Sequence, residues 1–151
     1  MDKSILKAIA GAALVLALGA MPALAIDTGG DTTTAAPAGP SLADARADIA
    51  AKKWTAAIDK LKLIVTADNS SADAYNLLGY AYRNAGNYDL AGRAYAKALK
   101  LDPKHTGALE YQGILFVKLG QIDKAKANLA KIKTISGTGS EAYGDLAKAI
   151  G

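Results

Sequence analysis

Apolar positions in the middle of the chain recur at the spacing of α-helices. In the stretch AYNLLGYAYRN, residues 74–84, the side chains of Tyr75, Leu78 and Tyr82 fall on one helical face. A second helical pattern begins at Tyr88 and continues to the Asp102-Pro103 pair. The residue before a proline avoids the helical region, so this pair predicts the end of the second helix. The spacing therefore predicts two helices joined by a short turn.

Small residues interrupt this pattern at positions where two helices must approach each other. Gly79 on the first helix and Ala91 on the second predict a close contact, because bulky side chains on both helices would keep the backbones apart. Gly86 suits a left-handed turn, and Asn87 is expected to cap the helix that follows. Gly79 is thus interpreted as a packing residue and not as part of a phosphate-binding loop.

The same arrangement returns with a constant period of 34 residues. Large residues align with large ones, and small residues with small ones, without a gap. The aligned columns are Trp54, Tyr88 and Ile122; Ala57, Ala91 and Ala125; Leu61, Tyr95 and Leu129; Tyr75, Leu109 and Tyr143; Gly79, Gly113 and Ala147; Tyr82, Phe116 and Ile150; and Gly86 with Gly120.

This period and these columns resemble the tetratricopeptide repeat family. Residues 72–105 resemble a complete repeat, whereas residues 106–139 resemble a weaker copy with Gln112 in place of a leucine. Residues 41–71 resemble a degraded copy, in which Asp44 and Asp48 occupy positions expected to be apolar, so its first helix is expected to be rotated or frayed. Residues 140–151 match half of a further repeat and predict a capping helix that begins at Ser140.

The resemblance implies an all-α fold, a tetratricopeptide-type helix-turn-helix solenoid of about three repeats plus a C-terminal capping helix, over residues 41–151. Its predicted structural core consists of Trp54, Ala57, Leu61, Tyr75, Leu78, Gly79, Tyr82, Ala91, Tyr95, Ala98, Pro103, Gly113, Phe116, Ala125, Leu129 and Tyr143.

The N-terminal part has a different composition and predicts export. Residues 1–25 have lysines, then an apolar stretch, then Ala23-Leu24-Ala25, which is typical of a cleaved signal peptide. Residues 26–40 are rich in Thr, Ala, Gly and Pro and predict a disordered linker. We therefore expect an exported, periplasmic protein. The alternative is an uncleaved N-terminal helix that anchors the chain in the membrane, since the apolar stretch approaches the roughly 20 residues needed to span it.

Composition removes several classes of chemistry. The 151 residues contain no cysteine, which excludes disulfides and thiolate metal sites, and the net charge of +4 does not indicate a nucleic-acid binder. Asp27-Thr28-Gly29 matches a protease triplet but lies in the predicted linker, and the single histidine, His105, is interpreted as a loop or cap residue. No constellation of residues predicts an enzyme, a cofactor or a metal site.

The resemblance implies instead a concave groove, lined by the first helix of each pair, that binds a peptide or helix of another protein. The candidate groove residues are Arg46, Asn76, Tyr80, Arg83, Asn84, Glu110, Ile114, Val117 and Lys118. Tyr80, Ile114 and Val117 would form an apolar floor, and the asparagines would bond a peptide backbone.

Arg46, Arg83 and Lys118 would favour an acidic partner or one with a free carboxylate. The predicted function is a protein-interaction adaptor in the cell envelope, in which the membrane is contacted only through an uncleaved signal segment. The alternative function is a weakly basic binder of anionic membrane or cell-wall polymer.

Overall fold

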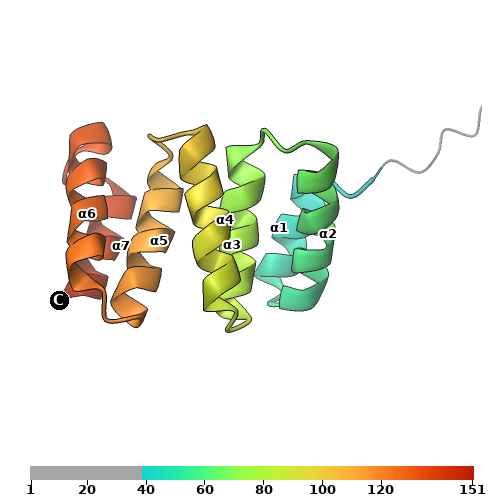
Figure 1. Ribbon diagram of the computed structural model, residues 1–151, viewed down its shortest axis with the longest axis horizontal. Coiled ribbons are helices and arrows are strands. Elements are labelled where there is room, and N and C mark those ends of the chain that lie inside the picture. The colour runs from blue at the N-terminus through green and yellow to red at the C-terminus, as the bar shows by residue number, and fades with distance from the viewer. Residues whose placement is uncertain (1–38) are drawn as a thin grey trace, which may run out of the picture. The chain divides into compact units, whose positions relative to one another are not determined.

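The computed structural model describes residues 39–151, which form seven α-helices and no strand (Figure 1). The helices are α1 (Leu42–Ala50), α2 (Trp54–Ala67), α3 (Ala72–Asn84), α4 (Tyr88–Leu101), α5 (Thr106–Lys118), α6 (Ile122–Ser136) and α7 (Glu141–Ile150). The predicted signal peptide (1–25) and all but the last two residues of the predicted linker (26–40) lie outside the described residues. Among residues 39–151, no helix has the length and apolar character required to cross a bilayer.

Polar side chains set the beginnings of several helices, including the one predicted at Ser140. The hydroxyl of Ser71 accepts a hydrogen bond from the Ala74 backbone N–H at 3.2 Å, and the hydroxyl of Ser140 accepts one from Tyr143 at 3.3 Å. Asn87 occupies the N-cap position of α4, but its side chain makes no capping hydrogen bond, which corrects that expectation. α4 ends at Leu101, directly before the Asp102-Pro103 pair.

α1 has 9 residues, whereas its counterpart α3 has 13. The two acidic residues of α1 make polar contacts instead of entering a core. Asp44 does not face a core. It forms a capping box with Ser41, in which the Ser41 backbone N–H donates to the Asp44 carboxylate at 2.9 Å. Asp48 pairs with Lys60 of α2 at 2.6 Å. The expected irregularity of this helix is therefore a late start with a side-chain cap.

The glycines in the aligned column make room for different side chains. A Cβ atom placed on Gly79 would lie 2.6 Å from two carbons of the Tyr95 ring, so Gly79 accommodates the flat face of that ring. The expected partner, Ala91, is buried nearby in the same cluster as Tyr95, but it does not supply the atoms nearest to Gly79. A Cβ atom on Gly113 would instead lie 2.5 Å from the Leu146 side chain of α7.

Burial of the predicted core is graded. Side chains that point between the helices of a pair are buried, whereas several large residues lie half-buried between pairs. The buried set is Ala57, Leu61, Leu78, Gly79, Ala91, Tyr95, Ala98, Gly113 and Ala125, and the half-buried set is Trp54, Tyr75, Tyr82, Phe116, Leu129 and Tyr143. Pro103 is exposed in the turn after α4, so it terminates a helix and is not a core residue.

The helices form a curved stack, and the first helix of each pair lies on its inner side. The first helices of the pairs, α1, α3, α5 and α7, approach one another in sequence, whereas α2, α4 and α6 contact only first helices. Elements on the concave side of a curved stack are the closer ones, so the first helices form the inner face of residues 39–151. This face positions the candidate site.

Candidate peptide-binding groove

An aromatic cluster joins consecutive helix pairs on the side where the first helices meet. Trp54 and Tyr80 pack edge to face with ring centroids 6.2 Å apart, and Tyr80 lies 5.0 Å from Tyr111 of the next pair. The guanidinium of Arg83 lies over both tyrosines, 5.2 Å from the Tyr80 centroid and 5.7 Å from that of Tyr111. Arg83 is thus held between two aromatic rings from neighbouring repeats.

Beside this cluster, α5 and α7 enclose a cleft of about 350 Å³ that we call the acidic cleft. It is lined by Glu110 and Tyr111 of α5, by Glu141 and Asp145 of α7, and by Ser136 and Ser140 between them. Glu141 and Asp145 are exposed, whereas Glu110 is only 9% exposed. Across residues 39–151, the Glu110 carboxylate has no hydrogen bond or ion pair with another side chain.

The surroundings of Glu110 oppose its ionisation. Burial, followed by the nearby carboxylates of Asp145 and Glu141, raises the pKa of Glu110 to about 7, while Arg83 acts in the opposite direction. A cation placed in the cleft would favour the ionised carboxylate. No group of acidic or histidine residues that could hold a metal ion occurs in the described part of the chain.

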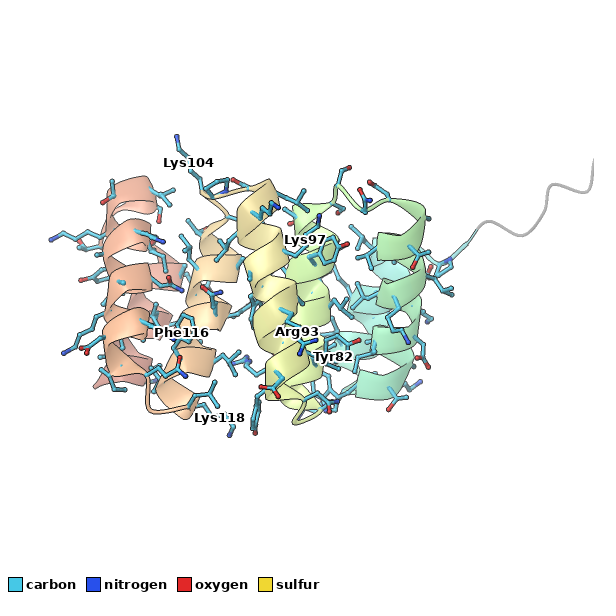
Figure 2. All side chains as sticks on the ribbon, viewed as in Figure 1. Tyr82, Arg93, Lys97, Lys104, Phe116 and Lys118 are labelled. Carbon is cyan, nitrogen blue, oxygen red and sulfur yellow. The ribbon has the colours of Figure 1, made fainter. Side chains whose placement is uncertain are left out.

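The other predicted cations lie elsewhere. Arg46 makes a long, exposed ion pair with Asp73 at 3.8 Å. Lys118 lies at the far end of α5 (Figure 2), where its ammonium group is 5.3 Å from the centroid of the Tyr88 ring. The structure therefore does not bring Arg46, Arg83 and Lys118 together into one cationic site.

The two predicted asparagines differ in their exposure and their hydrogen bonds. Asn76 is 7% exposed, and its amide oxygen is buried without a hydrogen-bond partner among the described residues. The amide nitrogen of Asn84 donates to the Tyr80 carbonyl oxygen within α3 at 2.8 Å. Ile114 and Val117 are half-buried against the core formed by the third pair and α7, so they present only part of their surface.

His105 has the structural role expected of a cap residue. Its Nδ1 accepts a hydrogen bond from the Ala108 backbone N–H at 3.1 Å, and its Nε2 lies 3.0 Å from the Asp73 carboxylate. Since Nδ1 is the acceptor, the proton of the neutral ring resides on Nε2, which donates to Asp73. His105 thus begins α5 and ties it to the start of α3.

Sequence reasoning missed the part of the site contributed by Tyr111, Glu141 and Asp145. The two acids stand four residues apart on α7, which places them on one helical face, and they occupy the same repeat columns as Gly107 and Tyr111. Treating the last helix as one more groove-forming helix, as well as a cap, would have included them.

Comparison with known proteins agrees with this geometry. The model of a family described as tetratricopeptide repeat matches residues 72–105. The rice (Oryza sativa subsp. japonica) DnaJ protein P58IPK homolog A is 37% identical over 65 residues, which are 43% of this chain and 14% of that protein. The chain thus spans only a small part of the length of the curated relatives that it matches.

Two solved structures share the fold over most of the chain. The crystal structure of MamA superposes with a TM-score of 0.65 and 27% identity, and the match covers 72% of this chain and 63% of MamA. The Yersinia enterocolitica type III secretion chaperone SycD, in complex with a peptide of the translocator YopD, superposes with a TM-score of 0.62 and 17% identity over 70% of this chain and 80% of SycD.

The described helices therefore define a helix-turn-helix repeat solenoid with a side-chain-lined inner face. Residues 72–105 form a tetratricopeptide repeat, and the helices of residues 39–151 share the solenoid fold of MamA.

Proposed function

We propose that this protein is an adaptor of the cell envelope whose inner face binds a peptide or helix of a partner protein. The observation that supports the binding site most directly is the contact between Tyr80 and Tyr111. These half-buried rings from consecutive repeats provide rigid apolar surface with polar edges, which suits peptide binding. SycD, which shares the fold, is a chaperone that holds a peptide of the translocator YopD.

The envelope location depends on the N-terminal segment. Lys3 and Lys7, the apolar residues 8–20 and Ala23-Leu24-Ala25 together support export. A cleaved signal peptide would release the repeat domain into the periplasm, whereas an uncleaved segment would hold it at the membrane. The proposal assigns the chain no catalytic activity and no cofactor.

The proposal of an acidic group or free carboxylate in the partner now depends on Arg83. Among the three cations on which it was based, only Arg83 lies beside the Tyr80–Tyr111 contact. A carboxylate approaching these rings would meet the guanidinium edge, although the Arg83 Nε is itself buried.

A pair of substitutions tests the groove. The full-length protein and its Tyr80→Ala/Arg83→Ala variant would be used to capture partners from an envelope extract, and the retained proteins would be identified by mass spectrometry. We expect the variant to lose the partners that the unmodified protein retains, while its circular dichroism stays helical.

The matched control is Tyr88→Ala/Arg93→Ala, which removes the same two residue types from α4, a second helix. This control should retain the partners. Capture that survives the Tyr80/Arg83 change, or that is lost equally in the control, would place the binding site elsewhere.

The dependence of binding on ionic strength distinguishes the alternative function, which is binding of an anionic membrane or cell-wall polymer. The exposed lysines of α6, namely Lys124, Lys126, Lys131 and Lys133, could provide such attraction. Retention through these charges should collapse between low and moderate ionic strength, whereas retention on an aromatic groove should decline much less.

A further inference from the structure

The acidic cleft combines a buried, unpartnered carboxylate with two exposed ones aimed at the same space. Glu110 contributes the buried group from the inner face of α5, and it is 91% shielded from solvent yet lines the cleft. A buried carboxylate is usually hydrogen-bonded or paired, because leaving it without a partner is unfavourable. The described chain supplies no side-chain partner, and the carboxylate oxygens are not among the fully enclosed polar atoms, so they are open to the cleft. A cation that enters the cleft would supply the partner that the described side chains do not.

The chemistry of that ligand follows from the charge and size of the cleft. Glu110, Glu141 and Asp145 supply up to three negative charges, and the hydroxyl of Ser136 supplies a further acceptor. The three carboxylates do not form a group that could hold a metal ion. An extended organic cation with several N–H donors can reach acceptors on both helices, and a volume of about 350 Å³ accommodates such a side chain.

We propose that the acidic cleft between α5 and α7 binds a lysine or arginine side chain of the partner segment held on the inner face. This inference rests on the proposed function, since the segment must first lie across the first helices. Tyr111 lines the cleft and also contacts Tyr80, so it connects the cleft with the aromatic cluster. The basic side chain would enter the cleft next to the residues that contact Tyr80 and Tyr111.

The experiment is a selection from a library of random dodecapeptides displayed on phage, with the full-length protein as bait. We expect the enriched peptides to share one position occupied by lysine or arginine. Synthetic copies of these peptides should bind the Glu110→Gln/Asp145→Asn variant roughly tenfold or more weakly, because two charge-assisted contacts are removed.

The matched control is Asp59→Asn/Asp123→Asn, which makes the same change in net charge at exposed positions of α2 and α6. It should bind the peptides as the unmodified protein does. A second variant, Glu141→Lys/Asp145→Lys, alters only exposed residues and should select peptides with an acidic residue in place of the basic one.

The outcomes separate the two proposals. Enriched peptides that lack a common basic position, or that bind the cleft variant and the control equally, would overturn the cleft assignment and leave the groove intact. Peptides that depend on the cleft but bind the Tyr80→Ala/Arg83→Ala variant unchanged would overturn the groove and retain the cleft. A selection that enriches no peptide would overturn both.

Discussion

Lys52 holds a backbone conformation that glycine holds in the two equivalent turns. Its φ angle is 56°, and Gly86 and Gly120, which follow at intervals of 34 residues, have φ angles of 83° and 71°. The left-handed region is unfavourable for a residue with a Cβ atom. The turn between α1 and α2 is therefore strained relative to the other two.

Replacing Lys52 with glycine should stabilise the fold. We expect Lys52→Gly to raise the free energy of unfolding by up to about 1 kcal/mol. The substitution relieves the left-handed strain, and the greater conformational entropy of glycine in the unfolded chain offsets part of this gain. Chemical denaturation would measure the change. Lys53→Gly is the control, because Lys53 has a φ angle of −83° and gains nothing from the substitution. A loss of stability in Lys52→Gly, or an equal gain in both variants, would contradict the prediction.

Glu110 destabilises the fold in its ionised form and lines the cleft to which we assign a ligand. Its burial and its acidic neighbours raise the pKa to about 7, so ionisation at higher pH destabilises the folded state. A residue kept only for stability would be neutral or apolar at this position. The proposed basic ligand would offset this cost, because a cation in the cleft favours the ionised carboxylate.

Between helices α5 and α6, two polar residues have replaced an apolar pair together. The amide nitrogen of Asn128 donates to the Leu109 carbonyl oxygen and to the side-chain oxygen of Gln112, both at 3.0 Å. In the preceding repeat, the equivalent columns contain Leu78 and Ala94, which are buried in one cluster. Gln112 is thus a departure from the family pattern that Asn128 compensates.

A double-mutant cycle should show this coupling. Asn128→Ala leaves two acceptors without their donor and should destabilise the protein by about 1–3 kcal/mol. Adding Gln112→Leu restores the residues of the preceding repeat and should recover most of that loss, with a coupling energy of about 0.5–3 kcal/mol. Urea unfolding of the unmodified protein, the two single variants and the double variant gives the four corners of the cycle. Additive losses would show that the two side chains act independently.

This pair also shows what the repeat pattern could predict at the level of elements. The 34-residue columns predicted the helix pairs and the turn at Gly86, because these depend on local sequence. They did not predict which side chain fills the space beside a glycine. Gly79 faces Tyr95 of α4, which belongs to the same helix pair. Gly113 faces Leu146 of α7, which lies outside its pair.

The candidate site was predicted less completely for the same reason. Tyr80, Arg83 and Glu110 were identified because they lie on the expected face of their helices. Lys118 and Asn76 lie on the same faces. The Lys118 ammonium group lies over the Tyr88 ring, and Asn76 is buried. Both outcomes depend on side chains of neighbouring repeats. The spacing of residues along one helix predicts the face on which each side chain lies. It does not predict which side chains of the neighbouring helices that face will contact.

At the scale of residues 39–151, each helix pair contacts only its neighbours, so stability should be distributed unevenly along the stack. α7 contacts only α5 and α6, and Leu146 is its single buried side chain. The acidic cleft lies between α5 and α7 and therefore depends on this last contact. The proposed binding site thus lies at a position where neighbouring helices support the stack from one direction only.

Leu146→Ala tests this distribution. The substitution removes the side chain that covers Gly113 and should destabilise the C-terminal part by about 2–5 kcal/mol, the usual range for a buried leucine. Hydrogen exchange followed by mass spectrometry should show faster exchange in α5, α6 and α7, with α1, α2 and α3 nearly unchanged. Leu63→Ala, at a leucine that is 60% exposed, is the control and should alter neither region. Equal acceleration in all seven helices would show that the stack unfolds as one unit. In that case the cleft between α5 and α7 could not open locally, and its Glu110 carboxylate would be reached only through its mouth.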